Sequence, residues 1–506
     1  MAAMRAAQPP VQILTRERDE PQSGESRIFP SSRFFLPGIN CQTVARAQRA
    51  ALLIDGAAYF DAFVRTALRA RESLVIVGWD FHSATPLHAP DNVPDRLGEF
   101  LNWLARRRRN LRINVLIWDC PLVFSKGRES QFTRASWTPH RRVSVCYDDT
   151  CAVGSALHQK IVVVDGAVAF CGGIDLTLGR WDTPEHLTED ARRAHPDTEA
   201  PYPPFHDAML AVDGGAARAL QSLVSHRWLR ATGSPLPEPR AGRDPWPQEL
   251  RPDFNDVNVA IARTVAESPG ESAVVEVRRL YLDLIAAARH CIYLENQYLT
   301  CAELGDALAT RLCDPGGPEI IVVVRPEGQG WLEAPTMGAL RSALLHKLYE
   351  ADRYGRLRAY YPCLAGERDD SCCDLHSKLM IVDDEWLRVG SANFANRSMA
   401  VDMECDLAIE ASGDPRTRAA IAAARNRLIA EHLDRSVAAV RKAIRSQGSL
   451  VRAIDSLVRS SGRTLRPLEK PTDPPLAIAA IAGVVDPETP VGFWSVRQWL
   501  TQWPNS

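Results

Sequence analysis

Two eight-residue segments of the chain carry the same pattern of residues that could act on a phosphate ester. His158 to Asp165 reads HQKIVVVD, and His376 to Asp383 reads HSKLMIVD. In each segment a histidine and a lysine two positions apart precede four apolar residues and an aspartate. An imidazole can act as a nucleophile or carry a proton near neutral pH, and a lysine ammonium attracts phosphate oxygens. Two copies supply the two histidines that a double displacement at phosphorus needs.

The apolar run in each segment predicts a buried strand that holds the histidine and the lysine. Four β-prone residues in succession are typical of a strand rather than of a helical turn. Because side chains two apart on a strand share a face, Lys160 and Lys378 each project beside their histidine. The aspartate stands at odd spacing, and Asp165-Gly166 is a strong hairpin signal. We therefore interpret Asp165 and Asp383 as structural turn residues.

A single copy of the pattern would favour a simpler interpretation, in which a core strand happens to carry a histidine and a lysine. The residues downstream of the two copies also correspond, however. Gly172 to Asp175 reads GGID and Gly390 to Asn393 reads GSAN, at the same distance from the respective histidine. The matched spacing favours a duplicated functional site.

The elements around the two segments are repeated as well. Residues 291–299 align with residues 73–81, and both this pair and the two motif histidines are 218 positions apart. Strands predicted at 113–118 and 320–324 also correspond, and an amphipathic helix is predicted over 59–71. Strands that alternate with helical stretches predict an α/β sandwich in each half of the chain.

The doubled segments resemble the duplicated His-Lys-Asp signature of the phospholipase D superfamily, including the GSAN continuation at Gly390 to Asn393. The stretches GWDF, GGID followed by GRWD, and ENQY are also similar to those of phospholipases D. The likeness extends roughly from the strand before Trp79 to the helix ending near His432. It implies two phospholipase D-like α/β sandwich lobes that pack face to face, with both motifs and the active site at their interface.

Two carboxylates complete the predicted catalytic pairs. Asp207 and Glu404 occupy equivalent places at the starts of equivalent strands. A carboxylate beside an imidazole fixes its tautomer and stabilises its charged form. The resemblance implies that Glu404 orients His158 and that Asp207 orients His376, each across the interface. Surface carboxylates at strand starts are the alternative for either residue alone.

Further polar residues are candidates for binding the substrate. Asn393 could donate to phosphate oxygens together with Lys160 and Lys378. Asp175 stands where the family pattern has asparagine, and a carboxylate there would repel phosphate. We therefore expect Asp175 to orient a neighbour or to bind a polar headgroup while lining the cleft. Three residues at a matching strand end are also expected to line the cleft, namely Glu295, Asn296 and Gln297.

These residues predict a phosphodiesterase that works through a covalent phosphohistidine. One histidine attacks phosphorus while the other protonates the leaving alcohol and then activates water or another alcohol. The resemblance favours His158 as the nucleophile and His376 as the acid and base. The lysines supply positive charge, and the sequence shows no cluster of metal ligands, so we expect no metal or other cofactor.

The resemblance implies hydrolysis of glycerophospholipids to phosphatidic acid and a headgroup alcohol, with transphosphatidylation as a second outcome. The alternatives are a phosphatidyl transferase similar to cardiolipin synthase, a nuclease, and a catalytically inactive membrane-binding scaffold. Intact His-Lys pairs in both motifs argue against the scaffold. The balance of 60 Lys+Arg against 62 Asp+Glu lacks the basic excess of nucleic-acid binders, so we expect no nucleic-acid partner.

Composition also predicts the domain boundaries. We expect a poorly ordered lead-in at 1–40, a first lobe at 41–230, a linker at 231–255, a second lobe at 256–435 and a tail at 436–506. Proline, glycine and charge dominate the linker. The tail ends in four aromatic residues that suit either a membrane-surface helix or packing against the body, namely Phe493, Trp494, Trp499 and Trp503.

The location and assembly are predicted from similar arguments. The first residues show no apolar segment of a signal peptide, and no apolar run is long enough to span a membrane. Twelve scattered cysteines without a CxxC pair favour reduced thiols. We expect a cytoplasmic or peripheral membrane protein that meets its phospholipid substrate at the membrane surface. Since both motifs lie in one chain, we expect a monomer.

Overall fold

The computed structural model describes residues 32–119, 137–152, 154–240, 244–268, 272–325, 333–364, 372–468 and 485–489. The four aromatic residues at the end of the tail lie outside these ranges, and so do residues 1–31 of the predicted lead-in. Residues 32–40 differ from the expectation of poor order. Phe35 is buried in the core of the second half, and Asn40 accepts a hydrogen bond from the Leu36 N–H at 2.7 Å. The apolar side chain and the closed turn fix this segment on the body.

The first half of the chain forms the first lobe. Its elements are β1 Thr43–Ile54, α1 Asp55–Ala67, β2 Ser73–Gly78, α2 Leu97–Arg107, β3 Arg112–Trp118, β4 Val143–Asp148, β5 Ile161–Val164, β6 Val168–Gly172, β7 Phe205–His206, β8 Ala208–Asp213 and α3 Gly214–Thr232. The predicted motif strand is β5, and the strands predicted at 73–77 and 113–118 are β2 and β3. The positions of these strands are confirmed, but β5 begins at Ile161, and so His158 and Lys160 lie in the segment that leads into the strand and not on it.

The second half repeats the arrangement as the second lobe. Its elements are β9 Phe254–Val265, β10 Val274–Val275, α4 Glu276–Ala287, β11 Cys291–Asn296, α5 Ala302–Cys313, β12 Glu319–Val323, α6 Glu333–Ala351, β13 Leu357–Cys363, β14 Asp374–Leu375, β15 Lys378–Val382, β16 Trp386–Gly390, α7 Asn396–Ala400, β17 Glu404–Glu410 and α8 Pro415–His432. The second motif strand is β15, as predicted.

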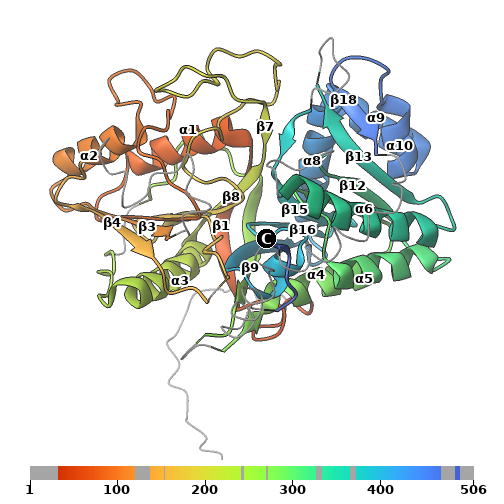
Figure 1. The fold of residues 1–506 in the computed structure, drawn as a ribbon, viewed down its shortest axis with the longest axis horizontal. Helices are drawn as coiled ribbons and strands as arrows, with labels where there is room; N and C mark the ends of the chain where they lie inside the picture. Colours follow the sequence, from red (N-terminus) through yellow and green to blue (C-terminus); the bar gives the residue numbers. More distant parts are fainter. Residues whose placement is uncertain are drawn as a thin grey trace, which may run out of the picture. The chain divides into compact units, whose positions relative to one another are not determined.

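The two lobes share one continuous sheet. The described strands form a 16-stranded sheet in the order β18-β13-β12-β11-β15-β16-β17-β9-β1-β8-β6-β5-β2-β3-β4, with β10 beside β9. In Figure 1 the first-lobe strands lie on the left and the second-lobe strands on the right, with β1 and β9 between them. The sheet faces of the two lobes also pack against each other in one shared core, as expected, and Cys171 Sγ of β6 donates to the Cys405 carbonyl of β17 at 3.5 Å. The long strands β1 and β9 pair antiparallel over 43–50 and 254–261 and join the lobes edge to edge, which leaves neither edge unpaired.

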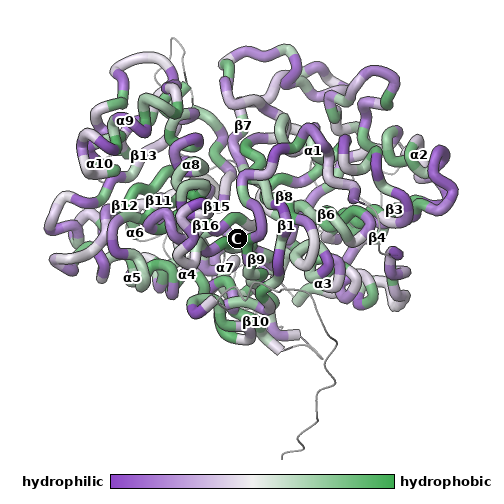
Figure 2. The backbone as a smooth tube through the Cα atoms, turned by 180° about the vertical axis from the view of Figure 1, so that it is seen from behind, coloured by the Kyte–Doolittle hydropathy of each residue, from purple (hydrophilic) through white to green (hydrophobic). Residues whose placement is uncertain are grey.

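Helices cover both faces of the sheet. In the first lobe α1 and α2 bury one face of the sheet, and α3 lies on the other face (Figure 1). In the second lobe α4, α5 and α6 cover one face, and α8 covers the other. Hydrophobic segments gather along the strands between these layers, as Figure 2 shows from behind. Each lobe is thus an α/β sandwich, as predicted.

The second lobe extends beyond its predicted end at residue 435. Three further elements follow, namely α9 Val437–Gln447, α10 Leu450–Leu457 and β18 Thr464–Pro467. Strand β18 pairs antiparallel with β13, and Ser449 at the start of α10 donates to Glu319 of β12. Residues 437–467 are therefore part of the packed lobe, because β18 completes an otherwise open sheet edge. None of the helices in the described ranges is both long and apolar enough to cross a bilayer.

Candidate active site

Each motif strand ends in a turn whose aspartate ties it to the neighbouring strand. Asp165 has a φ of +50° and Gly166 a φ of +62°, which is the left-handed pair that the Asp-Gly signal predicts. The Asp165 carboxylate accepts hydrogen bonds from the backbone N–H groups of residues 71–73, each at 2.8 Å. Asp383 does the same with residues 289–291, at 2.6–2.8 Å. Both aspartates therefore fix the ends of the motif strands. This agrees with the interpretation of Asp165 and Asp383 as structural turn residues.

Short strands that cross between the lobes bring the two motifs together. The residue before the first motif, Leu157, bridges Met403 in parallel, and the His158 N–H donates to the Met403 carbonyl at 2.9 Å. Correspondingly, β14 pairs in parallel with β7, and the His376 N–H donates to the His206 carbonyl at 2.8 Å. In both cases the partner residue directly precedes a carboxylate of the opposite lobe. The backbone pairing therefore sets each histidine beside that carboxylate.

The carboxylates bind the histidines across the interface. His158 Nδ1 lies 3.1 and 3.0 Å from the two oxygens of Glu404, and His376 Nδ1 lies 2.6 Å from Asp207 Oδ2. This is the pairing that the family resemblance implies. Ser391 Oγ also donates to Glu404 at 2.5 Å and holds it in position. With Nδ1–H donated to a carboxylate, Nε2 of a neutral imidazole is left free to react.

The two motif lysines are buried and have different partners. Lys160 is 2% exposed, and its Nζ lies 3.3 Å from Asp175 Oδ2. Lys378 is 1% exposed, and its Nζ donates to Gln297 Oε1 at 2.9 Å. Asp175 also accepts from the Trp79 N–H at 2.9 Å, so it orients a neighbour, as one of its two expected roles requires. Lys160 therefore faces a carboxylate, whereas Lys378 faces a neutral amide.

Burial changes the protonation behaviour of these groups. Burial, together with the charges of Lys160 and Lys378, holds the pKa of His158 well below its ordinary value. The pKa of His376 is lowered in the same way, and Lys160 of the opposite lobe contributes to the shift. Burial lowers the pKa of Lys378 to about 7 and raises that of Asp207 to about 7. The two motifs therefore act on each other electrostatically and form one site.

Two of the residues expected to line the cleft are instead interior. Glu295 and Asn296 are both 0% exposed. The carboxylate of Glu295 is bonded to His206 Nε2 at 2.9 Å and to His432 Nε2 at 3.0 Å, because α8 covers this face of β11. Asn296 points to the opposite face of the strand and accepts from the Phe394 N–H at 2.9 Å. Of the three predicted residues, only Gln297 lies beside the reacting groups.

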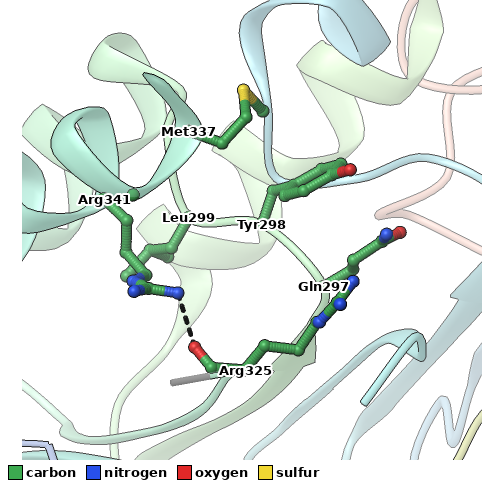
Figure 3. Close-up of a pocket in the computed structure, with 7 residues that line it drawn as sticks. Gln297, Tyr298, Leu299, Arg325, Met337 and Arg341 are labelled. Atoms are coloured by element: carbon green, nitrogen blue, oxygen red, sulfur yellow. Dashed lines mark hydrogen bonds between the residues drawn. The ribbon is translucent and has the colours of Figure 1, made fainter. Parts of the chain in front are cut away.

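Gln297 also borders a small pocket next to Lys378. The pocket is a shallow, partly open recess lined by Gln297, Tyr298, Leu299, Arg325, Met337, Gly338 and Arg341. Figure 3 shows the Arg325 side chain reaching toward Gln297, and the Arg341 guanidinium donates to the Arg325 carbonyl at 2.5 Å. Neither motif histidine lines this pocket. It is a cationic and partly apolar recess at the second-motif side of the site.

Asn393 is positioned to offer its amide group to a ligand. The residue is 6% exposed, and its backbone N–H donates to Ser398 Oγ at 3.1 Å. Its side-chain oxygen is buried without a hydrogen-bond partner among the described residues. Asp486 accepts from the Asn396 and Arg397 N–H groups at 3.1 and 2.8 Å and caps α7 just after it. A phosphate oxygen would be bound by the donating Nδ2 group of Asn393 and not by its accepting Oδ1, and so the phosphate-binding role stays a prediction.

Residues that sequence reasoning left unassigned also approach the site. Arg180 contributes to the lowered pKa of His376 and lies over the Phe205 ring, with 4.9 Å between its guanidinium carbon and the ring centroid. Behind Asp207 lies a buried group of histidines and carboxylates that includes His186 and His206. Arg180 lies in the GRWD stretch that resembles phospholipases D, and His186 lies four residues after it. This resemblance was the sequence signal that could have identified both residues.

Comparisons with known proteins agree with this geometry. A family model described as "Phospholipase D" matches residues 66–243, and one described as "Cardiolipin synthase, PLD-like domain" matches residues 281–426. Phospholipase D1 of Schizosaccharomyces pombe is 25% identical over 50% of this chain and 24% of its own length. Phospholipase D gamma 3 of Arabidopsis thaliana is 24% identical over 72% of this chain and 60% of its own length. The chain thus spans a quarter to three fifths of these relatives.

The fold has been seen in a solved structure as well. A phosphatidylserine synthase of Haemophilus influenzae superposes with a TM-score of 0.53 at 13% sequence identity. The superposition covers 77% of this chain and 88% of the synthase. At this identity the likeness concerns the fold, and it includes both lobes.

Proposed function

Because the chain belongs to the phospholipase D superfamily, we propose that it cleaves glycerophospholipids to phosphatidic acid and a headgroup alcohol through a phosphohistidine. The observation that carries the proposal is the pair of histidine–carboxylate contacts across the interface. His158 with Glu404 and His376 with Asp207 give two oriented imidazoles in one buried site. Two buried lysines accompany them.

In the first step His158 acts as the nucleophile. Its Nε2 forms a bond to phosphorus, and the bond between phosphorus and the headgroup oxygen breaks. The resulting imidazolium carries the phosphatidyl group on Nε2 and a proton on Nδ1, and Glu404 stabilises its positive charge. His376 transfers the proton on its Nε2 to the leaving oxygen. The anionic diester offsets the lysine charges that otherwise disfavour the protonated form of His376.

In the second step the neutral His376 acts as a base. It takes a proton from water, the water oxygen bonds to phosphorus, and the phosphorus–nitrogen bond to His158 breaks. Lys160, Lys378 and Asn393 hold the non-bridging oxygens in both steps and stabilise their charge in a site that excludes most water. The cycle restores both histidines. When an alcohol replaces water, the product is a phosphatidyl alcohol instead of phosphatidic acid.

Phosphatidyl transfer is the second candidate function. The family model that matches residues 281–426 carries the description "Cardiolipin synthase, PLD-like domain", and this name denotes a synthesis reaction. The same histidine pair serves either reaction, since only the acceptor of the phosphatidyl group differs. We further propose that the protein works as a monomer on the membrane surface, where its substrate resides. Nucleic acid is not a proposed substrate.

The direct test is a product analysis with mixed lipids. Vesicles of acyl-labelled phosphatidylcholine, phosphatidylethanolamine and phosphatidylglycerol are incubated with the protein and 1-butanol, with tert-butanol as the control alcohol. We expect phosphatidic acid in both mixtures and phosphatidylbutanol only with 1-butanol, and neither product with His158→Asn. Cardiolipin formed in excess of phosphatidic acid would favour the transferase. No lipid product at all, with cleavage of single-stranded DNA, would contradict the proposal.

A further inference from the structure

A second cluster of ionisable side chains lies behind the active site and takes no part in the proposed reaction. Asp55, His186, His206 and Glu431 come from four separate segments, namely the start of α1, the loop after β6, strand β7 and helix α8. One donor atom of each residue lies within 4.8 Å of the donor atoms of the other three. We refer to these four residues as the inner cluster. Asp55 and His206 are 0% exposed and His186 is 4% exposed.

The spacing within the inner cluster suits four-coordinate metal binding. His206 Nδ1 lies 2.8 Å from Glu431 Oε1 and 3.0 Å from Asp55 Oδ1. His186 Nε2 lies 3.2 Å from Glu431 Oε1 and 3.7 Å from Asp55 Oδ2. Donor atoms at about 2.0–2.2 Å from a tetrahedral zinc ion are roughly 3.3–3.6 Å apart. Three of the four observed separations are shorter than that range and one is longer, so the donor atoms would move apart by a few tenths of an ångström to hold the ion.

Hydrogen bonding accounts for only part of these close contacts, since His186 Nε2 and Glu431 Oε1 form a hydrogen bond at 3.2 Å. Neither oxygen of Asp55 has a hydrogen-bond partner among the described residues, and His206 Nδ1 has none either. This holds although two carboxylate oxygens lie within 3.0 Å of that nitrogen, because a hydrogen bond also needs the N–H to point at its acceptor. A buried carboxylate left without a partner is strongly unfavourable. A cation between the four groups would satisfy all of them.

The outer nitrogens of both histidines are already committed to carboxylates. His186 Nδ1 lies 2.8 Å from Asp182 Oδ2, and His206 Nε2 lies 2.9 Å from Glu295 Oε2. A histidine that donates its outer N–H to a carboxylate presents a lone pair on its inner nitrogen. This carboxylate–histidine arrangement is typical of metal ligands, because it fixes the tautomer and the ring orientation. Without a metal, the inner nitrogens must carry protons in order to face the two carboxylates, and a bound cation would take the place of these protons.

We propose that the inner cluster binds one divalent transition-metal ion, with zinc as the ion that its donors fit best. Two imidazoles and two carboxylates match zinc, whereas calcium and magnesium prefer oxygen ligands alone. Four protein donors in a buried setting describe a structural site rather than a catalytic one. This proposal differs from the sequence-based expectation of no metal. It does not rest on the proposed lipid chemistry.

The ion would hold the two lobes together behind His376. Asp55 and His206 belong to the first lobe and Glu431 to the second. His206 directly precedes Asp207, and the Asp55 N–H donates to the Asp207 carbonyl at 2.8 Å. Asp207 in turn binds His376 Nδ1. The inner cluster therefore consists of positioning residues that act on the acid–base histidine through Asp207.

The test is a measurement of metal content in protein purified without metal-affinity resin or chelator. By inductively coupled plasma mass spectrometry we expect about one zinc per chain in the unmodified protein. His186→Asn and Glu431→Gln should lose most of the metal, whereas His376→Asn, which removes a neighbouring histidine outside the cluster, should keep it. Since His376→Asn should not complete the catalytic cycle, zinc retained in this variant would show that metal binding does not depend on catalysis.

Two further measurements keep the test decisive if the cluster variants fold poorly. Dialysis of the unmodified protein against dipicolinate should lower its Tm, and added Zn²⁺ should restore it. Replacement by Co²⁺ should produce the intense visible absorption of a tetrahedral site, and His376→Asn should leave that absorption unchanged. The proposal would be overturned if the unmodified protein contained no transition metal and if neither dipicolinate nor Zn²⁺ changed its Tm. Full metal content in His186→Asn would overturn it as well.

Discussion

At the scale of single residues, the two motifs supply the same reactive groups in unequal surroundings. Lys160 is paired with the Asp175 carboxylate, whereas Lys378 is paired with the neutral Gln297 amide. Asp175 corresponds to Asn393 and Gln297 corresponds to Trp79 in the repeat, and so the asymmetry arises from differences at two repeated positions. A repeated site with one neutralised lysine has two chemically distinct sides. Such a difference allows the two histidines to take different roles.

The assignment of the two histidines predicts where a covalent intermediate accumulates. In His376→Asn, attack on a substrate with a good leaving group needs little acid assistance, but release still needs a base. Phosphoenzyme should therefore build up on His158. Mass spectrometry after a rapid quench should locate the label there, and the label should be labile in acid and stable in base.

The matched control is His158→Asn, which should carry no label. Label found on His376 in that variant would reverse the assignment and leave the reaction class unchanged. Absence of label from both variants, with a soluble diester still turned over by the unmodified protein, would contradict the covalent mechanism.

The lowered pKa of His158 predicts the pH dependence of the attack step. An imidazole is nucleophilic only when neutral, and its ordinary pKa is about 6.5. Because burial holds the pKa of His158 well below its ordinary value, the group stays neutral as the pH falls past 6.5. Phosphoenzyme formation in His376→Asn should thus not decline as the pH falls from about 8 to 6.5, because protonation of Lys378 near pH 7 favours phosphate binding, and it should decline only under more acidic conditions.

Glu404→Gln provides the comparison for this profile. Loss of the carboxylate removes the group that orients His158, and we expect the attack rate to fall by roughly 10²–10⁴. Stopped-flow release of the leaving group measures both effects. A decline of the attack rate at or above pH 6.5 as the His376→Asn variant is acidified would contradict the predicted neutral state of His158.

At the scale of elements, the motif strands depend on the aspartate turns that come after them. Asp165 and Asp383 each accept three backbone N–H groups from the start of the adjacent strand, and both have left-handed φ values. Alanine lacks the acceptor oxygens and tolerates this backbone conformation poorly. We expect Asp165→Ala and Asp383→Ala to lower the free energy of unfolding by about 1–3 kcal/mol each.

Asparagine at the same positions is the control. Asn tolerates the left-handed conformation and keeps one acceptor oxygen, so Asp165→Asn should be less destabilising than Asp165→Ala. Urea unfolding measures the difference, and turnover per folded molecule of a soluble diester should stay close to that of the unmodified protein. Equal stability of all these variants would show that the turn bonds contribute little.

At the scale of the whole described body, the lobes share a sheet and should not unfold separately. Strand β1 pairs with β8 of its own lobe and with β9 of the other, and β9 in turn pairs with β17. Melting of either lobe would expose the edge of a 12-residue strand in the other. We expect one cooperative calorimetric transition, and Asp165→Ala should lower the stability of both lobes together.

Hydrogen exchange read out by mass spectrometry provides the local test. Peptides from β5 and from β15 should lose their protection at the same denaturant concentration, in the unmodified protein and in Asp165→Ala. Two separated transitions, with the variant affecting β5 alone, would show that the lobes are independent and that the β1–β9 pairing is weak.

The sequence by itself determined the parts of the protein that depend on neighbouring residues. The motif strands β5 and β15 are predicted by short apolar runs, and the Asp165 turn is predicted by its Asp-Gly pair. The duplicated register identified both motifs, and the family resemblance identified the carboxylate partner of each histidine. Each of these signals lies within one short segment or in the comparison of two such segments.

Only the tertiary structure decided which faces are covered and which strands are neighbours. Glu295 lies on β11 and Gln297 lies just past its end, yet only Gln297 reaches the site, because α8 from 137 residues further along covers Glu295. The joining strands β1 and β9 were not predicted, since their pairing brings together residues about 200 positions apart. The inner cluster could not be predicted either, because its residues are far apart in the sequence. Its four residues lie between positions 55 and 431, and only long-range folding places their donor atoms within 4.8 Å.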